Sequence, residues 1–189
     1  MLIFVKEDRS LVEKQEHTRF RDLFTVIFEN DQLLWVTLSM ALFMIGYTTT
    51  TSFGQYYFKY VFGNLDMYST FALILGIAQI SALSLFPKIS ALFNRKKFYF
   101  AATILVVLGY VVFFFAPNTT MLFVAIAGLL LFVGQACIQL LMLMFIADTV
   151  EYGQWKSGKR NDSVTLSLQS FINKIGSALA SGIVGITLI

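Results

Sequence analysis

Five apolar stretches in this chain are each long enough to cross the hydrocarbon core of a membrane, which takes roughly 20 residues in a helix. Only 13% of the residues are charged and 57% are hydrophobic, whereas a soluble domain carries about 25% charged residues. The stretches cover residues 33–62, 67–86, 98–116, 120–147 and 164–189. The sequence therefore predicts an all-α fold, a polytopic helical protein of the cell membrane.

The composition also excludes several classes of function. A mean hydropathy of +0.73 and 20 phenylalanines exclude a disordered chain, a nucleic-acid-binding module and an ordinary soluble enzyme. Cys137 is the only cysteine, so an intramolecular disulfide and a cysteine zinc site are excluded. His17 is the only histidine, so a histidine-rich metal site is excluded too. We expect no metal and no cofactor.

The basic residues lie in alternate connections between the apolar stretches. The connections at 63–66 and 117–119 hold no lysine or arginine. Because basic loops stay in the cytoplasm, we predict a cytoplasmic N terminus and a fifth span that ends outside. Residues 1–31 then form a cytoplasmic segment, in which 18–31 has the pattern of an amphipathic helix, and residues 32–189 form the membrane part. Twelve of the fourteen basic residues follow the rule: Lys6, Arg9, Lys14, Arg19, Arg21, Lys88, Arg95, Lys96, Lys97, Lys156, Lys159 and Arg160.

Polar residues form a stripe along the fifth stretch, at spacings of three and four. The stripe is flanked by Gln169 and Asn173. Small residues can serve close helix packing alone, but that explanation does not cover Lys174, which lies too deep to reach an interface easily. We therefore predict a pathway or binding role for Lys174. The stripe consists of Ser163, Ser167, Ser170, Lys174, Ser177 and Ser181.

Other polar residues lie within the spans and need partners. Lys59 shares a helix face with Ser52 and Gln55 but lies near the end of its span, so snorkelling to the interface explains it. Gln135 and Gln139 are predicted to line the same interior, because a buried amide requires hydrogen bonds.

A charged patch follows the fourth stretch. Asp148 and Glu151 are one helical turn apart, and Lys156, Lys159 and Asp162 follow at spacings of three. Two interpretations stay open: a solvated loop with balanced charges, or a cytoplasmic gate whose charge pairs form and break as helices move.

Several runs of the sequence resemble the glycoside–pentoside–hexuronide:cation symporters, the melibiose and lactose permease branch of the major facilitator superfamily. The resemblance covers the whole chain and implies that the five spans correspond to helices seven to eleven of a twelve-helix carrier. The N-terminal six-helix half, which in this family holds the cation-binding acidic residues and most sugar contacts, is then a missing partner, as is helix twelve. The runs are Asn30–Leu33, Phe53–Phe58, Ala147–Arg160, Ser167–Ser170 and Lys174–Ala178.

The resemblance implies sugar transport by alternating access, coupled to Na⁺ or H⁺, with a galactoside as the expected sugar. Residues matching Gln169, Ser170 and Lys174 approach the sugar or stabilise the cation site in this family, with Asn173 beside them. Gln139 would face the same cavity, where melibiose-type members tend to have an aromatic residue. A fragment of this kind is not expected to transport alone.

Two other classes of function are alternatives to the symporter. One is a small stand-alone membrane protein, such as an assembly subunit without transport activity. The other is an intramembrane enzyme, which the sequence disfavours because no span holds paired carboxylates or a nucleophile beside a histidine. We therefore predict that the chain is not an enzyme and that its partners are a sugar, the lipid bilayer and the missing half.

Overall fold

The computed structural model describes residues 27–28, 30–117, 120–158 and 162–189. These residues form long helices and short connections, with no strand among them, so the predicted all-α fold is confirmed. Four of the helices are long and apolar enough to cross a membrane. The elements are α2 (Asp31–Tyr56), the π-helical turn η2 (Tyr57–Val61), α3 (Asp66–Leu92), α4 (Arg95–Phe115), α5 (Met121–Ser157) and α6 (Asp162–Thr187).

The fifth long helix, α6, differs from the other four in composition. Its 26 residues span about 39 Å, more than the ~30 Å of a hydrocarbon core. Its serines, amides and lysine lower its hydropathy, and it is not one of the four apolar spans. The expected amphipathic helix at 18–31 lies mostly outside the described residues.

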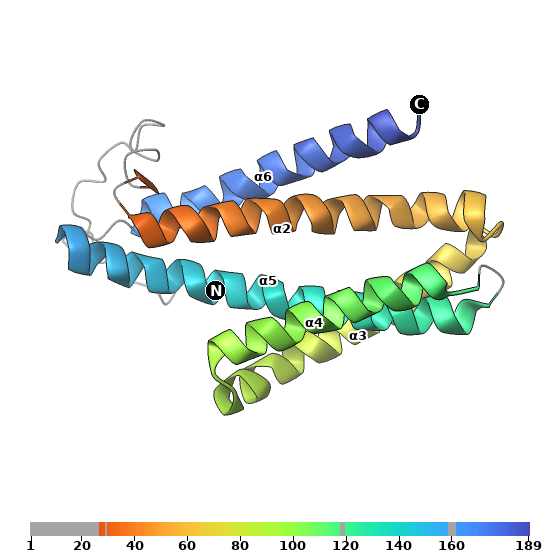
Figure 1. The fold of residues 1–189 in the computed structure, drawn as a ribbon, viewed down its shortest axis with the longest axis horizontal. Coiled ribbons are helices and arrows are strands. Elements are labelled where there is room, and N and C mark those ends of the chain that lie inside the picture. The colour runs from red at the N-terminus through yellow and green to blue at the C-terminus, as the bar shows by residue number, and fades with distance from the viewer. Residues whose placement is uncertain (1–26, 29, 118–119, 159–161) are drawn as a thin grey trace, which may run out of the picture.

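Helix α5 lies at the centre of the bundle (Figure 1). The α2–α6 pair packs on one side of it, and α3 and α4 pack on the other. Helices consecutive in the chain run antiparallel, so α2 and α6 run parallel to each other, and the start of α2, the end of α5 and the start of α6 lie at the same end of the bundle. Since α5 contacts every other long helix, it is the element that holds the two pairs together.

The helix ends follow local capping chemistry. Asn30 is the N-cap of α2, and its side-chain Oδ1 accepts a hydrogen bond from the Leu33 amide at 3.1 Å. α5 continues as a helix to Ser157, ten residues beyond the expected end of its span at Ala147, because no proline interrupts it before Gly158. Gly158 ends the helix with φ of +71°, a conformation that glycine adopts without strain. Asp148, Glu151 and Lys156 of the charged patch therefore lie on a helix and not in a loop.

Helix α6 packs on α2 through a row of small and apolar residues. A Cβ atom at Gly176 would lie 2.9 Å from Met44 Cβ, so only glycine permits this approach. Ser170 and Ser181 of the polar stripe lie away from this contact, since both are exposed. The buried row is Thr165, Leu168, Ile172, Gly176, Ala180 and Val184.

Candidate functional site

A small cavity lies about halfway along the bundle, where α2, α3, α5 and α6 meet. Its volume is about 220 Å³. Three of the five residues predicted for a substrate or cation cavity line it: Gln139 from α5, and Gln169 and Asn173 from α6. The Oδ1 atom of Asn173 is buried and has no hydrogen-bond partner among the described residues. Apolar side chains complete the wall, among them Met40, Phe43, Met44 and Leu83.

The other two predicted cavity residues, Ser170 and Lys174, do not line this cavity. Both are exposed on the outward face of α6, on the same helix turns as Gln169 and Asn173. Among the described residues, no carboxylate lies within ion-pair distance of Lys174. Gln135, which was expected beside Gln139, does not line this cavity; it is only 3% exposed, and its Oε1 has no hydrogen-bond partner in the part of the chain that the structure describes.

The charged patch on α5 belongs to one end of the bundle, which we call the charged end (Asn30, Asp31, Arg95, Asp148 and Lys156). Two ion pairs hold neighbouring helices to α5 there. Lys156 Nζ lies 2.7 Å from Asp31 Oδ1, which also accepts a hydrogen bond from the Tyr152 hydroxyl at 3.2 Å. Arg95, at the start of α4, is paired with Asp148. All four charged side chains are about half exposed, so water screens both pairs.

A buried amide supplements these ion pairs. The side chain of Asn30 is 6% exposed, and its Nδ2 donates to the carbonyl oxygen of Thr149 at 2.9 Å. Gly153, one turn further along α5, makes room for it, since a Cβ atom there would lie 2.9 Å from Nδ2. Asn30 therefore caps α2 and fastens it to α5 at the same time.

The structure separates the five predicted gate residues. Asp148 and Lys156 are used in contacts within this bundle. Glu151 is exposed, and no described basic side chain lies within ion-pair distance of it. Asp162 is the first residue of α6, but its side chain and all of Lys159 lie outside what the structure describes.

Sequence reasoning missed the partners of the charged patch. The sequence marks Arg95 only as a basic residue of a connection, and Asn30 and Asp31 only as part of a segment that resembles the family. Their contacts with α5 could not be predicted, because they join residues 53 to 125 positions apart in the chain. The one local signal was Asn30 in front of an apolar stretch, which is a typical N-cap position.

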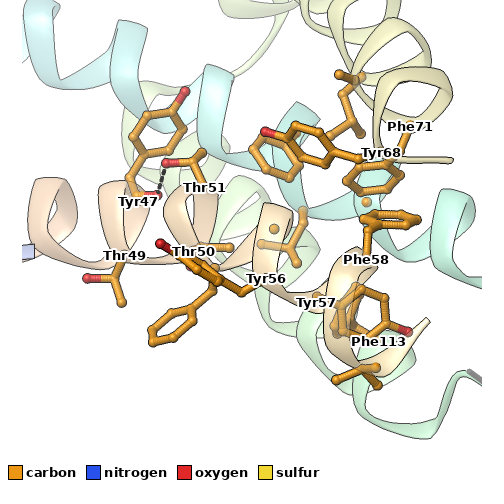
Figure 2. A pocket seen from close by; sticks show the side chains of 18 of the residues that line it. Tyr47, Thr49, Thr50, Thr51, Tyr56, Tyr57, Phe58, Tyr68, Phe71 and Phe113 are labelled. Carbon is orange, nitrogen blue, oxygen red and sulfur yellow. Dashed lines mark hydrogen bonds between the residues drawn. The ribbon is translucent and has the colours of Figure 1, made fainter. Parts of the chain in front are cut away.

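A second, larger cavity of about 720 Å³ lies at the opposite end, which we call the aromatic end (Tyr57, Phe58, Phe62, Tyr68 and Phe71). Figure 2 shows the labelled rings gathering where α2 and η2 meet α3 and α4. Phe58 is 1% exposed, with its ring centroid 5.1 Å from that of Phe71 and 6.0 Å from that of Tyr68. None of the predicted cavity residues lines it.

Comparisons with known proteins agree with the helical bundle. The family described as MFS/sugar transport protein matches residues 1–189. A lactose permease of Lactobacillus delbrueckii subsp. bulgaricus is 33% identical over 94% of this chain and 28% of its own length. A raffinose carrier protein of Pediococcus pentosaceus is 34% identical over 91% of this chain and 27% of its own length.

A putative sulfoquinovose importer of Salmonella typhimurium is 30% identical over 87% of the chain and 35% of its own length. The chain thus spans only about a quarter to a third of the length of these relatives. Because the family match extends over every residue and agrees with the membrane-spanning helices, this chain belongs to the MFS/sugar transport protein family.

Proposed function

We propose that this chain is part of a sugar:cation symporter that works by alternating access together with further helices of the kind its longer relatives possess. The chain contributes part of the substrate and cation cavity and one side of a cytoplasmic gate. Its role is transport without chemical change of the sugar. The charged end lies on the cytoplasmic side of the cell membrane. The distribution of lysine and arginine among the connections supports this orientation.

The observation that carries this proposal is the cavity halfway along the bundle. Carriers of this type bind substrate near the midplane, between two halves that rock about it. Gln139, Gln169 and Asn173 present amide groups around one space, beside the ring of Phe43. The unpartnered Oδ1 of Asn173 is an acceptor that a sugar hydroxyl or a water would satisfy.

A galactoside is the proposed sugar. Lactose and raffinose, after which two of the relatives are named, both contain a galactosyl unit. Amides that donate and accept in one cavity suit the hydroxyls of such a sugar. Lys174 lies on the exposed face of α6 next to the cavity, so we place it toward the missing half. There its ammonium would donate to the sugar or lie beside the site of the coupling Na⁺ or H⁺.

The gate proposal rests on Glu151. Asp148 and Lys156 already pair within the bundle, so Glu151 is the described acidic group of the patch that is available to a partner across the gate. Neutralising it by Glu151→Gln in a complete carrier should change the translocation rate more than the sugar affinity, because a gate contributes to the conformational equilibrium. Unchanged uptake and exchange would remove Glu151 from the gate.

The central experiment expresses the chain together with the remaining helices of a lactose-permease relative and measures uptake of labelled galactosides at varied pH and sodium. We expect galactoside accumulation that Lys174→Ala abolishes and that Lys174→Arg restores only in part, since guanidinium and ammonium differ in donor geometry. Lys96→Ala, at the exposed start of α4, is the matched control. Wild-type accumulation by Lys174→Ala would remove Lys174 from the site. No uptake of any galactoside would favour a stand-alone membrane protein without transport activity.

A further inference from the structure

The larger cavity, at the aromatic end, has walls from four helices and lies away from the proposed sugar site. Its volume of about 720 Å³ is within the usual range for pockets that hold a small molecule. The turn η2, at the C-terminal end of α2, forms one wall. Tyr57, Phe58, Tyr68, Phe71 and Phe113 contribute rings (Figure 2).

Three of the hydroxyls that line this cavity are hydrogen-bonded within the protein, whereas Thr49 Oγ1 and the Tyr57 hydroxyl are buried without a partner among the described residues. Thr50 Oγ1 lies 2.5 Å from the Tyr110 hydroxyl and 2.8 Å from the Gly46 carbonyl. Thr51 Oγ1 donates to carbonyls of the preceding turn, at 3.0 and 3.1 Å. A sugar would require many free donors and acceptors, whereas these walls offer mainly carbon. The cavity therefore suits a hydrocarbon chain better than a sugar.

A lone cation lies beside the cavity. Lys59 is on η2, and its Nζ is 4.9 Å from the ring centroid of Tyr60, which stacks on Tyr56 with centroids 6.4 Å apart. Both tyrosines line the cavity. The connections at this end, 63–66 and 117–119, hold no lysine or arginine, and no described carboxylate lies within ion-pair distance of Lys59.

We propose that this site binds an anionic phospholipid, with one acyl chain in the aromatic cavity and the headgroup phosphate on Lys59. The charge is complementary, since an ammonium at the end of a span lies at the level of lipid phosphates. Tyr56 and Tyr60 connect the cation to the cavity, as aromatic residues do at membrane interfaces. The site does not depend on the sugar proposal, because it uses none of the residues of the midplane cavity.

The test is photolabelling of the full 189-residue chain in phosphatidylcholine nanodiscs. The probes are phosphatidylglycerol and phosphatidylcholine, each with a diazirine on the acyl chain, and the labelled positions are mapped by peptide sequencing. We expect phosphatidylglycerol to label η2 and the first half of α3 about fivefold more than phosphatidylcholine does, and Lys59→Gln to remove that difference. Lys96→Gln, an exposed lysine at the charged end, is the matched control and should keep it.

A second variant fills the cavity. Gly76 lines it, and a Cβ atom there meets nothing within 4 Å, so Gly76→Leu projects into free space and should lower labelling by both lipids. Gly182→Leu on α6, where a Cβ atom also meets nothing within 4 Å, should have no effect.

Three results would overturn the proposal. The first is equal labelling by the two lipids, the second is labelling that is as strong on the exposed face of α4 as at η2, and the third is displacement of the label by an aryl galactoside. The last result would assign the cavity to a sugar. Because the readout is lipid labelling without transport, a failure of galactoside uptake leaves this test intact.

Discussion

The two ends of the bundle are stabilised by different kinds of interaction. At the charged end, a buried amide and two half-exposed ion pairs join α2 and α4 to α5. At the aromatic end, the rings of Phe58, Tyr68 and Phe71 pack against each other beside a cavity. One end relies on directional contacts between particular atoms, and the other on the area and shape of apolar rings.

This difference indicates which end tolerates change. Exposed ion pairs are weak and can exchange partners at little cost, which suits a gate. A ring that is almost fully buried is costly to remove, because the space it leaves is not refilled. We therefore expect the stability of the chain to depend mostly on the aromatic end and on Asn30, and only slightly on the charges.

The largest effect is expected for Phe58→Ala. Removing a ring that is 1% exposed should lower the free energy of unfolding by about 3–5 kcal/mol. Tyr60→Ala, two residues further and 67% exposed, should cost less than about 1 kcal/mol. Unfolding of both variants by denaturing detergent, followed by circular dichroism, checks this. Equal losses would mean that the aromatic end is not a packed core.

Next in size is Asn30→Ala. Loss of the N-cap should lower the free energy of unfolding by about 1 kcal/mol. Loss of the buried hydrogen bond to Thr149 should lower it by about 1–1.5 kcal/mol more. Asn64→Ala is the matched change at the aromatic end, where an exposed asparagine caps only the Asp66 amide. We expect it to cost about 0.5 kcal/mol. The same unfolding assay compares them, and a larger loss for Asn64→Ala would contradict the role assigned to Asn30.

A smaller loss is expected for Gly153→Ala. Its new methyl would lie 2.9 Å from Asn30 Nδ2 and should destabilise by about 1–2 kcal/mol by forcing the amide aside. Gly46→Ala in α2, where a Cβ atom meets nothing within 4 Å, should instead stabilise by up to about 1 kcal/mol through helix propensity. In the double variant Asn30→Ala, Gly153→Ala the penalty for the methyl should vanish, which a double-mutant cycle measures.

The smallest effect is expected for the ion pairs. Lys156→Gln and Arg95→Gln should leave the unfolding midpoint nearly unchanged at physiological salt, because both pairs are half exposed and screened. Any difference from the wild type should appear at low salt and disappear as salt is added. A large decrease in the unfolding midpoint that persists in high salt would show that these pairs stabilise the fold. The contrast between the two ends would then be wrong.

Helix α6 illustrates how far sequence reasoning reached. The polar stripe was found from spacing alone, and Ser170, Lys174 and Ser181 are indeed exposed. The opposite face of α6 is apolar and is divided in the structure: Leu168 and Ile172 are buried, whereas Ile175, Leu179, Ile183 and Ile186 are exposed. Periodicity identifies an apolar face, but in a membrane that face packs equally well on lipid or protein. Which part of the face packs on protein depends on Gly176, because this glycine lets α6 lie close to α2.

The sequence by itself determined the helices, because length, hydropathy and caps such as Asn30 and Gly158 act within a few residues. It also determined which connections are basic. Only the tertiary structure decided that Asn30 bonds to Thr149 and that Arg95 pairs with Asp148. These contacts join distant positions, and their geometry depends on how α5 packs between the two helix pairs, which no local pattern encodes.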